Sequence, residues 1–314
     1  MTLPTFNDIK EAHQRIRPYI HRTPVLTSQS VNRLLGAEVF FKCENLQKVG
    51  AFKFRGACNA VFSLTEDEAA LGVGTHSSGN HAAALALAAQ MRGINARIVM
   101  PVTAPEIKKK AVAGYGAEIT YCAPTLEARE TTLKQLVDQY GIVEVHPYNN
   151  FRVISGQGTA AIELIEEVPV LDIVMTPVGG GGLLSGTALS AKALLPNCQV
   201  IAAEPAGADD AYRSFHAGHI IPSTQPKTIA DGLLTSLGEM NFAIIQHSVD
   251  DIVTVSEEAI IKAMRMIWER MKIIIEPSSA VPVAALLEKK IQPDGQKIGI
   301  ILSGGNVDLG NLPF

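Results

Sequence analysis

Short apolar segments alternate with longer segments of helical periodicity, and this alternation restricts the possible folds more than any other feature of the chain. The apolar runs are EVFFKC (38–43), ARIVMP (96–101), EITYC (118–122), DIVMTPV (172–178), QVIAAE (199–204) and KIGIILS (297–303). Helical spacing is found at 80–91, 126–139, 185–194 and 257–272. Strands that are apolar throughout are typical of parallel sheets covered on both faces. We therefore predict a doubly wound α/β fold.

The length of the chain indicates either two domains or one large α/β unit that carries an insertion. The chain has 314 residues, whereas single hydrophobic cores seldom grow beyond about 250–300 residues. Residues 62–147 contain their own alternation of strands and helices. We predict that 62–147 form a smaller inserted domain and that 1–61 and 148–314 form the large domain.

Charge and cysteine content exclude several classes of function. With 27 Lys and Arg against 31 Asp and Glu, the chain has no basic field for nucleic acid. No apolar segment approaches the about 20 residues of a membrane span, and the polar N-terminal segment lacks a signal-peptide core. The four cysteines are spread out without CxxC or Cys/His pairing. These features predict a cytoplasmic protein with buried free thiols rather than a zinc site or a disulfide framework.

Three loops of small residues follow predicted strands. They are THSSGNHAAA (75–84), TPVGGGGLLSG (176–186) and LSGGNVDLG (302–310). In an open α/β sheet, ligands bind beyond the carboxyl ends of the strands. Backbone N–H groups and small hydroxyls from three such loops predict a site for one anionic ligand.

The second loop contains four consecutive glycines, Gly179–Gly182, directly after an apolar run. Glycines at a strand-to-helix turn let several N–H groups point at a phosphate, and the positive end of the helix that begins near Leu183 supports the same charge. The loop contains neither a Walker motif nor a clean GxGxxG. A tight strand–helix crossing remains an alternative, and Glu204, about 20 residues further on, also permits a dinucleotide-binding unit.

Lys53 lies between Phe52 and Phe54 in VGAFKFRGA (49–57). Desolvation among these rings lowers the pKa of a lysine and frees its neutral amine, which a Schiff-base nucleophile needs. Alternatively, the stem of Lys53 packs against the rings while its ammonium reaches water.

Four motifs in this order and spacing resemble the fold type II pyridoxal-phosphate (PLP) enzymes, in particular the branch of serine racemases, serine-threonine dehydratases and threo-3-hydroxyaspartate ammonia-lyases. The motifs are AFKFRGA (51–57), SSGNHAAALA (77–86), GGGGLLSG (179–186) and LSGGNVDL (302–309), and the similarity extends from HRTPVLTS (21–28) to the C-terminus. The resemblance implies two open, twisted, mostly parallel sheets flanked by helices. It also implies a large PLP-binding domain and a small domain that controls substrate access.

The resemblance implies a set of cofactor-binding residues. Lys53 carries the cofactor covalently and serves as a catalytic base, and Phe52 packs on the ring. Asn80 bonds the ring hydroxyl, and Ser303 faces the pyridine nitrogen. The phosphate is held by Gly179, Gly180, Gly181, Gly182 and the start of the helix at Leu183, and Gly232 approaches the cofactor. Glu276 also lies near the pyridine by this match, although a role at the start of the helix after Pro277 is equally compatible.

The loop Ser77–His81 is expected to bind the substrate carboxylate through Ser77, Ser78, Gly79, Asn80 and His81, with His81 acting through its backbone. In this family, a serine at the position of Ser78 acts as the acid/base opposite the lysine, whereas a serine that caps the helix is the alternative. Tyr148 departs from the asparagine found in some animal racemases.

The segment AEPAGADD (203–210) contains a cluster of acidic residues, which on its own indicates helix capping. In the racemase branch the matching positions bind Mg²⁺ or Mn²⁺ through oxygen ligands, which here gives Glu204, the Ala208 carbonyl and Asp210.

The resemblance implies an ammonia-lyase that converts small L-hydroxy amino acids (serine, threonine or threo-3-hydroxyaspartate) to a 2-oxo acid and ammonia, with serine racemase activity beside it. A homodimer is the family expectation. Two alternatives are a nicotinamide-dependent oxidoreductase that uses the glycine turn and Glu204, and a non-catalytic amino-acid-binding protein on the same scaffold.

Overall fold

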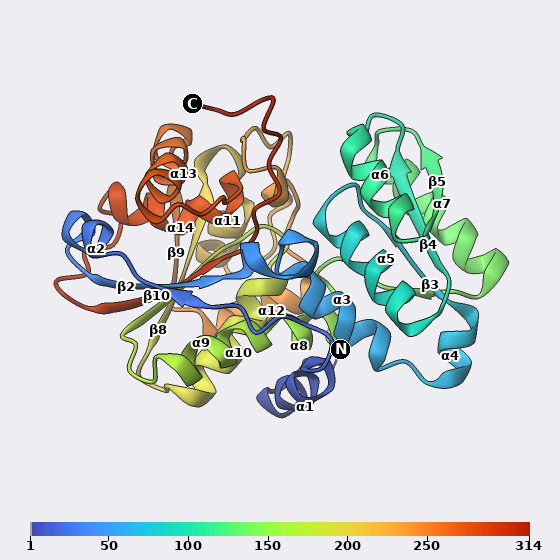
Figure 1. Ribbon diagram of the computed structural model, residues 1–314, viewed down its shortest axis with the longest axis horizontal. Coiled ribbons are helices and arrows are strands. Elements are labelled where there is room, and N and C mark those ends of the chain that lie inside the picture. Colours follow the sequence, from blue (N-terminus) through green and yellow to red (C-terminus); the bar gives the residue numbers. More distant parts are fainter. Residues whose placement is uncertain (1) are drawn as a thin grey trace.

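Two separate β-sheets form the centres of two lobes in the computed structural model, which describes residues 2–314 (Figure 1). The larger sheet has the order β1-β2-β10-β7-β8-β9, and the smaller has the order β5-β4-β3-β6. β1 is antiparallel to β2, and the other neighbouring strands are parallel. The larger sheet contains β1 (Val25–Leu26), β2 (Glu38–Cys43), β7 (Ile173–Pro177), β8 (Gln199–Pro205), β9 (Asp251–Val255) and β10 (Lys297–Leu302). The smaller contains β3 (Val73–His76), β4 (Ala96–Pro101), β5 (Glu118–Cys122) and β6 (Val143–Glu144).

Helices pack on both faces of the larger sheet, as its apolar strands require. One core cluster joins the sheet to α2, α13 and α14, and another joins it to α9, α10 and α12. The helices of this lobe are α1 (Phe6–Ile16), α2 (Gln29–Leu35), α3 (Lys53–Phe62), α8 (Phe151–Gln157), α9 (Thr159–Glu167), α10 (Gly182–Leu194), α11 (Asp210–Ala217), α12 (Glu239–Ser248), α13 (Glu257–Met271) and α14 (Pro277–Leu287). The smaller lobe contains α4 (Glu66–Leu71), α5 (Asn80–Arg92), α6 (Glu106–Gly114) and α7 (Leu126–Tyr140), and α3 lies between the lobes (Figure 1).

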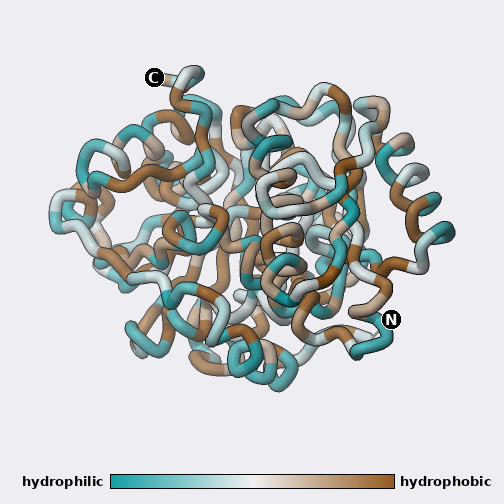
Figure 2. Tube along the Cα trace, turned by 45° about the vertical axis from the view of Figure 1, so that its right-hand side comes forward, coloured by the Kyte–Doolittle hydropathy of each residue, from teal (hydrophilic) through white to brown (hydrophobic). Residues whose placement is uncertain are grey.

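The core of the larger lobe follows the central strands. All five residues of β7 are buried, and Figure 2 shows hydrophobic segments in the interior with hydrophilic segments on outward turns and loops. The smaller lobe has its own core, in which Ile98 and Met100 of β4 pack with the alanine-rich face of α5. Two cores on two sheets explain why the chain exceeds the size of a single core.

The structure confirms the predicted α/β class and the six apolar runs as strands. β1, β3, β6 and β9 lie outside the predicted runs: β1 and β6 have two residues each, β3 has four, and β9 is an edge strand in which three of five residues are part-exposed. The four strands of the smaller sheet lie between residues 73 and 144, inside the predicted 62–147 segment, whose exact boundaries stay a prediction. No helix between residues 2 and 314 has both the length and the apolar character needed to span a bilayer.

Parallel pairing brings the small-residue loops to the carboxyl ends of their strands. The tetraglycine turn follows β7, and the loop that begins at Ser303 follows β10, its neighbour in the larger sheet. The Ser77–His81 loop follows β3 in the smaller sheet. The predicted site therefore lies where the two lobes meet.

Candidate active site

Lys53 is the first residue of α3, and the segment before it is fixed against the loop after β10. The Phe52 amide donates to the Ser303 carbonyl at 2.9 Å, and Ala51 forms a β-bridge with Gly304. Lys53 Nζ donates to the Pro147 carbonyl at 2.9 Å and lies 5.1 Å from the centre of the Phe52 ring. The chain thus places the lysine beside residues that are far apart in sequence.

Desolvation lowers the pKa of Lys53 to about 8, and the Glu276 carboxylate opposes this shift only in part. The residue as a whole is part-exposed. A lysine of lowered pKa has a larger fraction of neutral amine near neutral pH, and only the neutral amine attacks a carbonyl to form a Schiff base. The predicted electrostatic environment of Lys53 is therefore present.

A buried network of ion pairs also holds α3 in place. Arg55, fully buried, donates to Glu44 at 2.7 and 2.8 Å and to Glu163 at 2.7 and 2.9 Å. Lys42 Nζ donates to Glu163 at 2.6 Å. Burial alone would raise the pKa of Glu163, but Arg55 and Lys42 bring it down to about 2. Two cations and two carboxylates thereby anchor α3 to β2 and α9.

The tetraglycine turn is buried, and its amides are free. Within residues 2–314, no oxygen accepts a hydrogen bond from the amides of Gly179, Gly180 and Gly181, and the first amides of α10 lack acceptors by helix geometry. Gly181 has a φ of +91°, and a Cβ at Gly180 would overlap the Tyr148 ring. Since buried N–H groups are rarely left unpaired, this turn fits the oxygens of a phosphate.

Leu183 and Gly232 lie next to this turn. The Leu183 side chain is buried in the core, so only its backbone faces the turn. Gly232, in the short helix η4 (Asp231–Leu233), lies beside Gly179, and its amide donates to Ser278 Oγ at 3.2 Å.

The loop after β10 places two buried hydroxyls together. Ser303 Oγ lies 3.0 Å from Ser279 Oγ, which also bonds the Gly304 carbonyl and amide at 2.7 Å each. The Ser303 hydroxyl is therefore held by a residue of α14 that the sequence did not mark. Both side chains are neutral, in agreement with a neutral partner for a pyridine nitrogen.

Asn80, Glu276 and Asn306 form a chain of side-chain hydrogen bonds between the lobes. Asn80 Nδ2 donates to both oxygens of Glu276 at 3.1 and 3.2 Å, and Asn306 Nδ2 donates to Asn80 Oδ1 at 3.0 Å. The Glu276 carboxyl is buried, and burial raises its pKa to about 7. The expected bond from Asn80 to a cofactor hydroxyl therefore requires Asn80 to share its amide with Glu276. Asn306 follows the second glycine of the motif LSGGNVDL (302–309), but the motif alone does not predict its bond to Asn80.

The Ser77–His81 loop has the form of an anion-binding helix start. The N-cap of α5 is Gly79, with no side-chain cap, and the Gly79 amide donates to Ser77 Oγ at 3.3 Å. Ser78 is part-exposed, and its hydroxyl has no hydrogen-bond partner in the described chain. Capping therefore does not account for Ser78. The His81 ring is buried against the Val145 carbonyl, and burial lowers its pKa to about 3, which leaves only its backbone for substrate.

Glu204 and Asp210 are both fully buried. The oxygens of Glu204 accept from the Ala211 and Tyr212 amides, and Asp210 Oδ2 accepts from the Leu237 amide. Burial raises the pKa of Glu204 to about 9 and that of Asp210 to about 6, and Asp210 Oδ1 has no partner within residues 2–314. Ala208 ends the short helix η3 (Ala206–Ala208) between them.

Two buried carboxylates with an unpaired oxygen fit a cation, because a bound charge would offset their desolvation. No group of three His, Cys, Asp or Glu side chains among the described residues is placed for a metal, so backbone carbonyls and water would complete the coordination. Leu237 connects this cluster to the glycine turn, because its side chain packs against Gly181.

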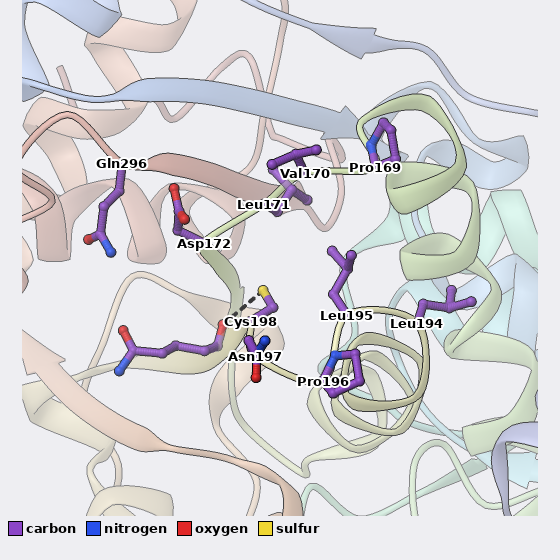
Figure 3. Close-up of a pocket in the computed structure, with 11 residues that line it drawn as sticks. Pro169, Val170, Leu171, Asp172, Leu194, Leu195, Pro196, Asn197, Cys198 and Gln296 are labelled. Carbon is purple, nitrogen blue, oxygen red and sulfur yellow. Dashed lines mark hydrogen bonds between the residues drawn. The ribbon is translucent and has the colours of Figure 1, made fainter.

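A cavity of about 460 Å³ lies elsewhere, among Pro169–Asp172, Leu194–Gln199 and Gln296 (Figure 3). These residues lie just before β7 and β10 and at the start of β8, so the cavity is at the amino ends of the strands. Ligand sites of open α/β sheets lie at the opposite ends. The predicted site is therefore not this cavity.

The fold, the desolvated lysine and the phosphate-type turn define a class of enzyme, and sequence comparison agrees. Residues 16–304 match the family described as pyridoxal-phosphate dependent enzyme. The chain belongs to this family.

Individual relatives cover nearly the whole chain. A serine racemase of Dictyostelium discoideum is 55% identical over 99% of this chain and 98% of its own length. A beta-hydroxyaspartate dehydratase of Paracoccus denitrificans is 52% identical over 100% of both chains. The structure of maize serine racemase superposes with a TM-score of 0.97 at 47% identity, covering 98% of this chain and 95% of that one.

These comparisons confirm the predicted family, the fold type and the general class, a PLP-dependent lyase or racemase. The nicotinamide-dependent alternative is not supported, and Glu204 is too deeply buried to reach a ribose hydroxyl. The non-catalytic alternative likewise loses its basis. The assigned roles of individual residues stay predictions.

Proposed function

We propose that this chain converts small L-hydroxy amino acids to a 2-oxo acid and ammonia, with no net loss of water, and also racemises serine. One observation carries the proposal. The Pro147 carbonyl accepts a hydrogen bond from Lys53, whose pKa is lowered, and the next residue, Tyr148, packs against Gly180 in the tetraglycine turn. The names of the relatives supply the substrate class, which includes serine and hydroxyaspartate.

When bound, PLP withdraws electrons from the substrate nitrogen, which makes the Cα proton acidic. Lys53 would hold the cofactor through its amine, and the same amine, when free, would take the Cα proton from one face of the substrate. Free amides of Gly179–Gly182 hold the phosphate, and Ser303 offers the pyridine a neutral partner. Because that partner cannot keep the pyridine nitrogen charged, the proposal favours rapid loss of the β-hydroxyl or rapid reprotonation.

Ser77, Ser78, Gly79 and the backbone of His81 would orient the substrate carboxylate at the start of α5. The Ser78 hydroxyl, free of structural bonds, would deliver a proton to the face opposite Lys53. Reprotonation there would give the D-amino acid, whereas loss of the β-hydroxyl as water, followed by hydrolysis of the C–N bond with release of ammonia, would give the 2-oxo acid. Both products then come from one deprotonated substrate.

Product analysis tests this assignment. The holoenzyme is incubated with L-serine, L-threonine or L-threo-3-hydroxyaspartate, and the 2-oxo acid, ammonia and D-serine are measured. Lys53→Ala is expected to lose every product and the violet absorbance. Ser78→Ala should reduce D-serine formation about a hundredfold or more while 2-oxo acid formation continues. The matched variant Ser77→Ala should change both products in proportion, and equal losses in the two variants would refute the role of Ser78.

We further propose that Glu204, the Ala208 carbonyl and Asp210 bind Mg²⁺ or Mn²⁺. The unpaired buried oxygen of Asp210 and the raised pKa of both carboxyls support this site. Thermal unfolding with EDTA, and then with added Mg²⁺ or Mn²⁺, tests it. The melting temperature should rise with the metal in the wild type and not in Asp210→Asn, and an equal rise in both would refute it.

A homodimer and a cytoplasmic location are part of the same proposal. Four buried free cysteines, Cys43, Cys58, Cys122 and Cys198, support a reducing compartment. Light scattering of the purified holoenzyme tests the oligomeric state, and fractionation of the source cells tests the location.

A further inference from the structure

Asn241 is a fully buried amide on α12 that none of the sequence motifs includes. Its Nδ2 donates to the Gly180 carbonyl at 2.8 Å and to the Tyr148 carbonyl at 3.2 Å. Only an NH₂ group can satisfy two carbonyls at once, so the orientation of the amide is determined. Asn241 thus joins the tetraglycine turn to the Tyr148 segment.

The bond to Gly180 fixes the direction of a neighbouring amide. The Gly238 amide donates to the same Gly180 carbonyl at 3.3 Å, so this oxygen is turned toward α12 and the residue before it. In a planar trans peptide the C=O and the following N–H point in opposite directions. The Gly181 N–H therefore points away from α12, to the side where a phosphate would be received.

The glycine turn has little else to hold this orientation. Gly181 has a φ of +91° and lacks a side chain, and a Cβ there would lie 2.8 Å from Asn241 Cβ. A glycine peptide can rotate at low cost in the absence of external bonds. Asn241 and the Gly238 amide supply those bonds, and α12 is fixed to the Tyr148 segment a second time by the Met240 amide, which donates to Asn149 Oδ1 at 3.0 Å.

We propose that Asn241 is a positioning residue for the cofactor phosphate: it holds the Gly180–Gly181 peptide so that the Gly181 amide faces the anion. This inference rests on the proposed role of the tetraglycine turn in binding phosphate. Asn241 would act on the phosphate only through this peptide, to whose carbonyl it is bonded.

Binding of PLP and of pyridoxal, which lacks the phosphate, separates this role from a general structural one. Protein freed of cofactor is titrated with each compound, and the absorbance of the lysine adduct gives an apparent Kd. Asn241→Leu, similar in volume but without a donor, should weaken PLP binding about tenfold and pyridoxal binding less than about twofold. The ³¹P resonance of bound PLP should shift as well.

A matched control lies on the same helix. Gln246 Nε2 donates to the Phe215 carbonyl at 2.8 Å, away from the turn, and Gln246→Leu should leave both Kd values unchanged. If Asn241→Leu does not fold, Asn241→Ser replaces it in the test, because the smaller serine side chain cannot clash with its neighbours. Its short hydroxyl cannot reach both carbonyls, and we expect the same selective loss of PLP binding in smaller degree.

Equal weakening of PLP and pyridoxal in the Asn241 variants, or no weakening of either, would overturn the proposal. If the wild type itself binds PLP no better than pyridoxal, the tetraglycine turn does not bind the phosphate, and both the turn and Asn241 lose their roles. A wild type that prefers PLP, together with variants that keep this preference, refutes Asn241 alone.

Discussion

The amine of Lys53 is held by one carbonyl, that of Pro147, and no carboxylate forms an ion pair with it in the described chain. Its reactivity therefore depends on desolvation, which lowers the pKa, and on the distant charge of Glu276, which raises it. The flanking phenylalanines in the sequence predicted the desolvation. They did not predict Pro147 or Glu276, because 94 and more residues separate these partners from Lys53.

Labelling of Lys53 should reveal this environment directly. In cofactor-free protein, we expect its acetylation rate by acetic anhydride to rise with a midpoint near pH 8, since the neutral amine forms as pH passes its pKa. Peptide mass spectrometry measures the rate, with exposed Lys134 as internal reference. Glu276→Gln removes the charge that raises the pKa, so the midpoint should move to lower pH. A midpoint near 10.5, the ordinary lysine value, would contradict the assignment.

At the scale of elements, α3 carries both the reactive lysine and its anchor. Lys53 is its first residue, and Arg55, two residues further, is fixed by Glu44 and Glu163. The strands and longer helices could be predicted because apolar runs and helical spacing are local properties. The Arg55 network could not, because its members lie in β2, η1 (Glu44–Leu46), α3 and α9 and only folding brings their charges together.

Removal of Arg55 should destabilise the protein strongly. Arg55→Met leaves Glu44 and Glu163 buried with Lys42 as their remaining cation, and such a broken buried network costs about 3–5 kcal/mol. Denaturant unfolding of the holoenzyme measures the loss. The control is Arg265→Met, which breaks an exposed pair with Glu269 and should cost about 0–1 kcal/mol. Similar small losses in both variants would show that the network does not anchor α3.

At the scale of the molecule, the candidate site is shared between two lobes. The sequence predicted this from the second strand–helix alternation within 62–147 and from the three loops. It could not show which side chains connect the lobes. The structure shows the Asn80–Glu276–Asn306 chain and an ion pair of 2.8 Å between Lys108 of α6 and Asp231, next to Gly232. Because 123 residues separate Lys108 from Asp231, no local sequence pattern predicts this pair.

Disruption of the Lys108–Asp231 pair should weaken the contact between the lobes without changing the rate of the chemical step, because neither side chain belongs to the proposed catalytic residues. Both side chains are partly exposed, at 30% and 53%, so the pair contributes about 0.2–1 kcal/mol and is screened by salt. We expect Lys108→Met to raise KM for L-serine about two- to fivefold with kcat unchanged, and to abolish the rise of KM with added salt in the wild type. Lys134→Met, which breaks an equally charged pair within α7, is the control. If Lys134→Met has the same effect, or if KM of the wild type is insensitive to salt, the pair does not govern the approach of the two lobes.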